Sequence, residues 1–402
     1  MDPISATSTR VVDIFPGKKL ENQRPFHAKL PGFLAADTND RTFRPAETSA
    51  EHFHTVGAGA QGDAVVAAVL KKAGQPDRKV VAKRYAINQN TTADQLRLLR
   101  REIRNMKFLV HQNVVPLLAT FWEPGTNSEG KGTIDTVWLV AERMDVSLAK
   151  YIELLGGKGG LRPSDHTVCL LVQLLMALDY LRQRGIMHRD INPKNIGLNK
   201  HNFVIKLLDF GSCGYTSSNG RHTTHVTTPW ANRPLEVLLH DEGGYNCAVD
   251  IWAVALTVLE FTGVPLFEFT ADDNRTEVEK RSSLMVNKIL DVMGLNEYCH
   301  GFKQLIAYEK RSGNLGKRLT TAANRIAPCP QGISTPKKFV ELLTAMLQPN
   351  PMDRPLPIQC LNYPYIEARA KWYMRDENRG RAEKSTAHDE LLEDLRHFSL
   401  QI

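Results

Sequence analysis

The hydrophobic pattern changes once along the chain, near residue 144, and this change limits the fold more than any other feature. Before it, short β-branched and aromatic runs predict strands at 54–56, 64–70, 79–85, 114–121 and 136–141. One helix is predicted over 92–110, where apolar residues recur at three- and four-residue steps. After the change, strongly apolar segments predict helices at 168–182 and 249–261 that are buried nearly all round, and further helices are expected at 284–293 and 336–347. A β-rich part followed by a larger α-rich part predicts an α+β fold with two lobes.

These patterns divide the chain into four expected parts. We expect an N-terminal extension at 1–50, a β-rich lobe at 51–143, an α-rich lobe at 144–370 and a C-terminal extension at 371–402. The first part mixes Pro, Thr, Asn, Asp and Gly without a sustained period. The last part contains a predicted amphipathic helix, whose apolar face consists of Leu391, Leu392, Leu395 and Phe398.

Composition excludes several classes of protein. The net charge of +7 is mild for 402 residues and no Lys/Arg run reaches five, so we predict no nucleic-acid partner. The longest nearly apolar run, 251–261, is too short to cross a bilayer, and no membrane association is predicted. Six cysteines lie far apart without a C-x-x-C pair, which favours a reducing compartment over a disulfide framework. We therefore expect a cytoplasmic location, with the nucleus left open as a further one.

A glycine-rich segment lies between the first two predicted strands. Gly57, Gly59 and Gly62 form a G-x-G-x-x-G pattern, in which missing side chains let backbone N–H groups approach phosphate oxygens. A strand follows, whereas the glycine turn of a dinucleotide-binding fold needs a helix there. The pattern is weak on its own, but it favours a nucleotide-phosphate loop and excludes the dinucleotide-binding fold.

The order of charged residues downstream is more specific. Lys83 ends the next strand, and Glu102 lies nineteen residues later within the predicted helix. A lysine held by a helix carboxylate is placed to contact the α- and β-phosphates of a nucleotide. Either residue alone is more often an ordinary surface residue.

The stretch from His188 to Asn195 and the triplet Asp209-Phe210-Gly211 carry the strongest signal. Phosphoryl transfer needs oxygen ligands for a metal ion and a carboxylate that orients the attacking hydroxyl. Asn195 and Asp209 supply the first, and Asp190 supplies the second. These residues follow the glycine loop, Lys83 and Glu102 in this order. A chance grouping of structural turn residues explains that order poorly.

Over about residues 50–370, the chain resembles the eukaryotic protein kinase domain. Within it, the chain is most similar to the mitogen-activated protein kinases of the CMGC group, and there to the stress-activated branch. The segments that carry this resemblance are VGAGAQG (56–62), HQNVVPLLATF (111–121), VWLVAERMDVSL (137–148), GIMHRDINPKNIGL (185–198), VNKILDVMG (286–294) and LLTAMLQPNPMDRPLPIQCLNYPYI (342–366).

The resemblance implies an ATP- and Mg²⁺-dependent enzyme that acts on protein substrates and has an upstream kinase. It implies that Lys83 pairs with Glu102, that Asp190 is the catalytic aspartate, and that Asn195 and Asp209 hold magnesium. It further implies a structural role for Arg189, a buried ion pair between Glu236 and Arg354, and that Asp250 braces the catalytic loop from within the long apolar helix. The residues implied to contact ATP are Val56, Gly57, Gly59, Gly62, Ala64, Lys83, Glu102, Glu142 and Met144.

The chain departs from the family at several positions. Asn192 replaces the lysine that neutralises charge on the transferred phosphoryl group, and offers only a hydrogen bond there. The activation segment, 213–236, lacks the T-x-Y pair, so Thr223 and Thr224 remain as phosphate acceptors that could pair with Arg189. The residues expected beside adenine are exchanged in size, with Ala64 and Val81 in place of valine and alanine; a one-residue shift of the alignment is the alternative.

The leading hypothesis is a serine/threonine protein kinase of intracellular signalling, with Asp190, Lys83 and Asn192 as catalytic residues. The alternative is a pseudokinase, a nucleotide-binding scaffold with little transfer activity, which Asn192 and the altered activation segment favour. A small-molecule kinase fits less well, because residues 212–236 and the Glu236/Arg354 pair resemble the protein-substrate platform of protein kinases.

Overall fold

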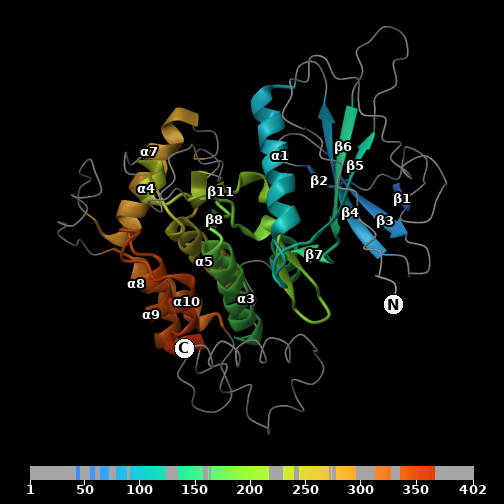
Figure 1. The fold of residues 1–402 in the computed structure, drawn as a ribbon. Coiled ribbons are helices and arrows are strands. Elements are labelled where there is room, and N and C mark those ends of the chain that lie inside the picture. The colour runs from blue at the N-terminus through green and yellow to red at the C-terminus, as the bar shows by residue number, and fades with distance from the viewer. Residues whose placement is uncertain are drawn as a thin grey trace. The chain divides into compact units, whose positions relative to one another are not determined.

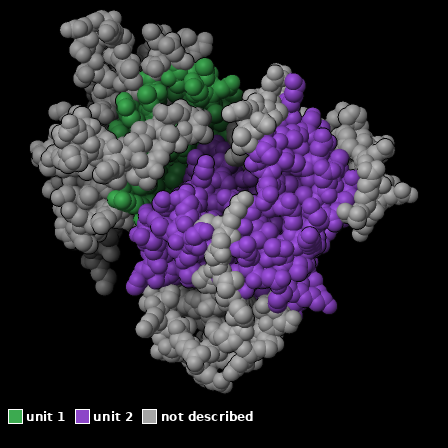
Figure 2. Space-filling view, turned by 180° about the vertical axis from the view of Figure 1, so that it is seen from behind, with its two compact units in different colours: residues 1–110, 115–143 green, residues 111–114, 144–402 purple. Residues whose placement is uncertain are grey.

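A computed structural model of the chain describes residues 42–45, 55–58, 64–71, 78–87, 91–123, 135–156, 162, 164–216, 230–239, 244–270, 273, 278–295, 313–326 and 336–366. The chain divides into two compact units (Figure 2). Unit 1 contains Met1–Val110 and Val115–Arg143, and unit 2 contains His111–Val114 and Met144–Ile402. The predicted C-terminal helix and the threonines at 223 and 224 lie outside the described residues.

Unit 1 is built on an antiparallel sheet of six strands. Its order is β1-β3-β4-β6-β5, and β2 also pairs with β3. In β4, Val80 and Ala82 are fully buried at alternate positions. In the neighbouring β6, every residue from Thr136 to Ala141 is buried. The strands are β1 (Thr42–Pro45), β2 (Thr55–Ala58), β3 (Ala64–Lys71), β4 (Arg78–Ile87), β5 (Leu117–Glu123) and β6 (Asp135–Glu142).

One long helix, α1 (Ala93–Phe108), packs beside this sheet and contacts β5 (Figure 1). It begins at a capping box, in which Thr92 and Gln95 exchange side-chain and backbone hydrogen bonds. Its buried face carries Leu99 and Met106 at the expected spacing, together with the polar residues Glu102 and Asn105. The amphipathic period therefore delivers a carboxylate to the interior of unit 1.

Unit 2 is mainly helical, and two apolar helices form its centre. In α5 every residue except Glu260 is buried, and α5 packs against α3. Helices apolar on all sides need neighbours on all sides, and the remaining helices supply them. The helices are α2 (Leu148–Leu154), α3 (Ser164–Gln183), α4 (Leu235–Leu238), α5 (Ala248–Phe261), α7 (Val278–Met293), α8 (Leu315–Asn324), α9 (Pro336–Met346) and α10 (Pro357–Leu361).

Short strands and 3-10 turns connect these helices where the chain reverses. A three-stranded sheet runs β10-β9-β7, and β11 pairs with β8. These elements bracket residues 188–195 and 209–211 in unit 2. The strands are β7 (Val146–Ser147), β8 (Ile186–Met187), β9 (Ile196–Leu198), β10 (Ile205–Leu207) and β11 (Gly214–Tyr215), and the 3-10 helices are η3 (Pro193–Asn195), η4 (Phe210–Ser212) and η5 (Trp230–Asn232).

The predicted succession of strands and then helices is present, and the α+β class is confirmed. The sequence did not predict β1 within the first fifty residues or the helix α8. β1 has four residues including a proline, and pairing with β3 rather than local propensity makes it a strand. No helix among the described residues is long and apolar enough to cross a membrane.

Candidate active site

In unit 1, Lys83 of β4 forms an ion pair with Glu102 of α1. Lys83 lies within the strand, which continues to Ile87, so the expectation that Lys83 ends it is wrong. Lys83 Nζ lies 3.0 Å from Glu102 Oε1, and the two side chains are 19% and 5% exposed. Tyr85 donates its hydroxyl hydrogen to Glu102 Oε2. Lys83 Nζ lies over the Tyr85 ring, 5.1 Å from the ring centroid. Both carboxylate oxygens are thus occupied, which fixes the direction in which Glu102 holds the ammonium. Tyr85 was not singled out from the sequence, although its spacing of two from Lys83 on a strand places both on one face.

The strand register identifies the neighbour of Lys83 on β3. Val65 pairs directly with Lys83, and Leu139 pairs with Lys83 from the other side. Directly opposed residues of antiparallel strands share a face of the sheet. The register therefore places Val65 on the same face of the sheet as Lys83. This favours the alternative alignment, shifted by one residue, in which Val65 rather than Ala64 lies beside adenine.

The other predicted ATP-contacting residues are spread over both units. Val56 and Gly57 lie in β2 at a register shift between Thr55 and Gly57, while Gly59 and Gly62 lie outside the described residues. Glu142 ends β6 in unit 1. Met144 belongs to unit 2, where a Cβ added at Gly197 would lie 2.4 Å from Met144 Cγ, so position 197 excludes any larger side chain.

In unit 2, a buried carboxylate holds the loop that contains Asp190. Asp250 Oδ2 and Oδ1 accept hydrogen bonds from the backbone N–H groups of His188 and Arg189, both at 2.8 Å. Burial raises the pKa of Asp250 to about 6, and these two bonds oppose the rise. Arg189 itself has a left-handed backbone with φ 64°, a conformation that the surrounding contacts must enforce.

Two asparagine amides hold the Asp190 carboxylate. Asn192 Nδ2 donates to Asp190 Oδ1 at 2.9 Å, and Asn195 Nδ2 donates to Asp190 Oδ2 at 2.8 Å. Burial raises the pKa of Asp190 to about 6, the nearby Asp209 charge adds to the rise, and the two amides lower it. The carboxyl group is thus oriented on both sides, and its pKa of about 6 lies well above the usual value of an aspartate.

Asn192 makes its hydrogen bonds within the catalytic loop. We expected its amide to replace a lysine beside the transferred phosphoryl group. In the structure its Nδ2 atom points to Asp190, and its Oδ1 atom accepts the Lys194 backbone N–H at 3.0 Å and caps η3. Lys194 instead lies near Glu260, where its charge opposes the rise that burial causes in the pKa of Glu260. Both polar atoms of the Asn192 amide are therefore used within the loop.

Asp209 follows β10 and is anchored by the residues around it. Its backbone is left-handed with φ 57°, and its Oδ1 atom accepts the Gly211 N–H at 3.2 Å. Phe210 is fully buried, and its ring packs edge-on against the His188 ring at 5.1 Å. Burial lowers the pKa of His188 to about 4, so its neutral ring bonds to the Leu208 carbonyl at 3.0 Å. The apolar contact of Phe210 thus sets the position of Asp209 beside the catalytic loop.

Glu236 and Arg354 form a buried bidentate pair. The two distances are 2.6 Å from Nη1 to Oε1 and 2.9 Å from Nη2 to Oε2, and both side chains have 0% exposure. Arg354 also donates to the carbonyls of Gln348, Pro349 and Ala248. Because the remaining guanidinium donors are satisfied, the pair can be buried without an unpaired charge.

The donor set of unit 2 suits a magnesium ion. Asp209 and Asn195 offer carboxylate and amide oxygens, which Mg²⁺ prefers, and Asn195 uses its amide nitrogen for Asp190. No cluster of three or more His, Cys, Asp or Glu side chains that could hold a metal occurs among the described residues. Two protein oxygens suffice for Mg²⁺ when nucleotide phosphates and water complete the coordination.

Comparison with known proteins agrees with this arrangement. Residues 50–366 match the sequence model of the protein kinase domain. The chain is 27% identical over 340 residues to the mitogen-activated protein kinase p38b of Drosophila melanogaster, covering 84% of this chain and 85% of that protein. It is 27% identical over 275 residues to the protein kinase gsk3 of Schizosaccharomyces pombe, with 67% and 65% covered. It is 32% identical over 276 residues to the CTD kinase subunit alpha of the same yeast, with 67% and 41% covered.

The chain thus spans less than two thirds of some relatives and most of the length of others. The predicted resemblance to protein kinases, MAP kinases among them, is confirmed. Because the family model covers residues 50–366, most of the sequence, the chain belongs to the protein kinase family.

Proposed function

We propose that the chain is an ATP-dependent serine/threonine protein kinase, MAP-kinase-like, that transfers the γ-phosphate of ATP to protein hydroxyl groups. The observation that supports this best is the Asp190 carboxylate, which two amides orient at 2.9 and 2.8 Å within a loop braced by Asp250. A scaffold that only binds nucleotide does not need a carboxylate oriented in this way.

Asp190 acts in this proposal as the group that orients and deprotonates the substrate hydroxyl. A general base works best when its pKa lies near the working pH, and a value of about 6 leaves most of the carboxylate ionised at pH 7. Lys83, held by Glu102, would contact the α- and β-phosphates of ATP. Asn195 and Asp209 would hold Mg²⁺, which when bound neutralises charge on the phosphate oxygens.

The partners and location are part of the same proposal. Protein substrates and an upstream kinase follow from the resemblance to MAP kinases, and a cytoplasmic location follows from the spacing of the cysteines. The roles proposed for Val56, Gly57, Gly59, Gly62, Glu142 and Met144 in ATP binding rest on the same resemblance. Because both polar atoms of the Asn192 amide make hydrogen bonds within the loop, we propose that Asn192 positions Asp190 rather than contacts the transferred phosphoryl group.

The test is transfer of radiolabelled phosphate from ATP to a generic protein substrate by the purified full chain. Asp209→Ala serves as the blank, and Asp190→Asn should lose transfer while retaining nucleotide binding, because it keeps the size of the side chain but cannot accept the proton. Wild-type chain that binds Mg-ATP and transfers nothing above the blank would replace this proposal with the pseudokinase.

A further inference from the structure

Tyr85 contacts both members of the ion pair between Lys83 and Glu102. Its hydroxyl donates to Glu102 Oε2, while Lys83 Nζ lies 3.0 Å from the other carboxylate oxygen, Oε1. The Lys83 ammonium also lies over the Tyr85 ring, in the position of a cation–π contact. One side chain thus donates a hydrogen bond to the anion of the pair and offers a ring face to its cation.

The geometry of β4 makes this double contact possible. Side chains two residues apart on a strand point to the same face, so Lys83 and Tyr85 leave β4 side by side. Tyr85 is 6% exposed and pairs with Val137 of β6, which is fully buried. A buried phenol needs a hydrogen-bond partner, and the Glu102 carboxylate is one.

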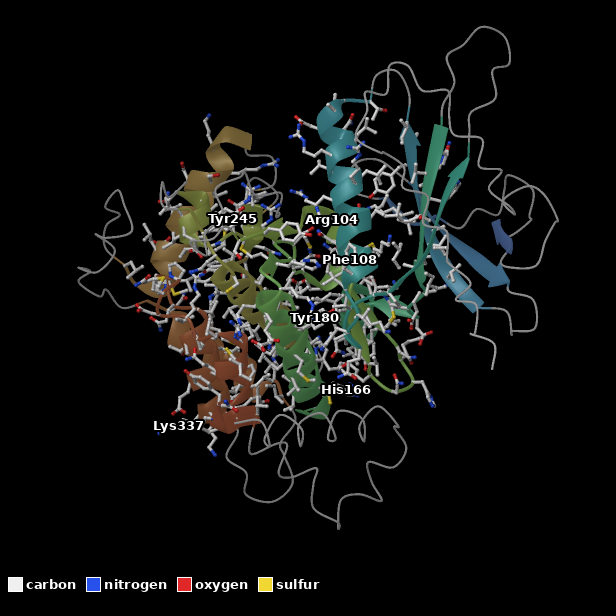
Figure 3. All side chains as sticks on the ribbon, viewed as in Figure 1. Arg104, Phe108, His166, Tyr180, Tyr245 and Lys337 are labelled. Carbon is white, nitrogen blue, oxygen red and sulfur yellow. The ribbon has the colours of Figure 1, made fainter. Side chains whose placement is uncertain are left out.

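Glu102 comes to this place from α1. It lies on the buried side of the helix together with Leu99 and Met106. Arg104 and Phe108, both labelled in Figure 3, are exposed to solvent. Through Glu102, α1 is therefore tied to β4 by two contacts of different kinds, an ion pair and a hydrogen bond from a phenol.

The hydrogen bond limits how the carboxylate can turn. The last torsion of a glutamate side chain is broad, so a carboxylate held at one oxygen can rotate and exchange its oxygens. With Tyr85 on Oε2, the plane of the Glu102 carboxylate is fixed, and Lys83 has one place opposite Oε1. Hydrogen bonds to an ionised group are about twice as strong as those between neutral groups, so this restraint is a firm one.

We propose that Tyr85 is a positioning residue, whose hydroxyl fixes the Glu102 carboxylate and through it the Lys83 ammonium that contacts the ATP phosphates. Without the hydroxyl, Lys83 keeps its charge and still attracts phosphate, but it loses its direction. Direction counts most in the transition state, where a fixed donor stabilises charge that develops on the phosphate oxygens. The effect on catalysis rests on the proposed kinase function, whereas the effect on the ion pair does not.

Tyr85→Phe removes the hydroxyl and keeps the ring beside the ammonium. Tyr151→Phe is the matched control in unit 2, because the Tyr151 hydroxyl pairs with His166 Nδ1 at 3.2 Å. His166, labelled in Figure 3, lies near the start of α3. Both changes are made in the full chain, and each variant is studied well below its melting temperature.

The ion pair is measured by acylation of Lys83 with an amine-reactive ester, quantified by mass spectrometry of the labelled peptide. An amine reacts only when it is deprotonated, and a paired carboxylate keeps it protonated, so the rate reports how well the pair is held. Tyr85→Phe should raise this rate at least ~10-fold, as expected for loss of a hydrogen bond to a charged group, and Tyr151→Phe should change it less than about twofold.

The kinetic readout separates orientation from binding. Tyr85→Phe should lower kcat about 10-fold and change the Kd for Mg-ATP less than about threefold, because the interaction lost is one that matters in the transition state. A purely structural role would lower the melting temperature while leaving kcat and the acylation rate unchanged.

Glu102→Gln tests whether Tyr85 acts through Glu102. This variant removes the carboxylate charge, so Lys83 should already be acylated fast. Adding Tyr85→Phe should then change the rate less than about twofold, since the two residues act in one network. Independent, additive effects would mean that the hydroxyl reaches Lys83 by another route.

Three results would overturn the proposal: a Lys83 acylation rate in Tyr85→Phe equal to wild type, an equal rise in Tyr151→Phe, or additivity with Glu102→Gln. Faster acylation with an unchanged kcat in an active enzyme would also refute the role in transfer. If wild type transfers no phosphate at all, the proposed function fails, and the acylation rates alone decide whether Tyr85 positions the pair.

Discussion

At the scale of single residues, the Asp190 carboxylate is tuned by the two amides that hold it. A hydrogen bond to the ionised carboxylate stabilises that form and lowers its pKa, so removing one bond raises the pKa from its present value of about 6. The ionised form is the active base. Activity is therefore lost as pH falls through this pKa, and any change that raises the pKa moves the loss to higher pH.

Asn192→Ala should shift the acidic limb of the kcat–pH profile upward by about one pH unit, the equivalent of one charge-assisted hydrogen bond of ~1.5 kcal/mol. Asn192→Lys should shift the limb in the opposite direction, because an ammonium beside Asp190 favours the carboxylate. The profile is measured at saturating Mg-ATP from pH 5 to 9. Asn199→Ala is the control, since Asn199 makes a similar local turn outside the catalytic loop. If the variants change kcat but do not shift the acidic limb of the kcat–pH profile, Asn192 acts on the transferred phosphoryl group rather than on Asp190.

At the scale of elements, the buried pair of Glu236 and Arg354 links α4 to the segment before α10. The two side chains are 118 residues apart in sequence and fully buried. Taking one partner away leaves a charge in the interior without its counterion, which is far more costly than losing a pair on the surface.

Glu236→Gln should lower the free energy of unfolding by about 3–5 kcal/mol, as a broken buried ion pair does. Glu153→Gln on α2 is the matched control, because Lys150 and Glu153 are 2.7 Å apart but mostly exposed, and it should cost less than ~1 kcal/mol. Both are measured by urea unfolding of the full chain. Equal destabilisation by the two variants would mean that burial of the Glu236 pair contributes nothing.

At the scale of the whole molecule, ligand binding and folding are linked. If Mg-ATP binds the folded chain at a concentration of 100 times its Kd, it stabilises the chain by ~2.7 kcal/mol. For a protein of this size that corresponds to a rise in Tm of at least several degrees. Asp209→Ala should lose most of the part that depends on Mg²⁺, while Asp190→Asn should keep it. A Tm that does not respond to Mg-ATP would contradict nucleotide binding itself.

The C-terminal extension also contributes at this scale. Its predicted apolar face, from Leu391 to Phe398, would gain ~1.5–3 kcal/mol for each large side chain that it buries against the kinase domain. Truncation at residue 385 should therefore lower Tm by several degrees in a scanning calorimetry experiment. A truncated chain that melts with wild type would show that this helix does not pack on the domain.

The sequence by itself determined the features that depend on local order along the chain. The periodicity of apolar residues predicted α1 close to its bounds, because an amphipathic helix buries the face that its own spacing creates. Long, strongly apolar runs predicted α3 and α5, because a helix that is apolar on all sides is buried on all sides. The order of Lys83, Glu102, Asp190, Asn195 and Asp209 likewise predicted a phosphoryl-transfer chemistry, since the residue types alone carry it.

Only the tertiary structure decided which side chains meet. Asn192 looked like a ligand of the phosphoryl group, and its contact with Asp190 came from the turn that η3 makes. Tyr245 carries no local signal, and its contact with Arg189 spans 56 residues. β1 becomes a strand through pairing with β3, not through its own propensity. Such contacts depend on how distant segments of the chain pack together. The spacing of residues along the sequence does not predict them, because it determines only which side chains share a face of one helix or strand.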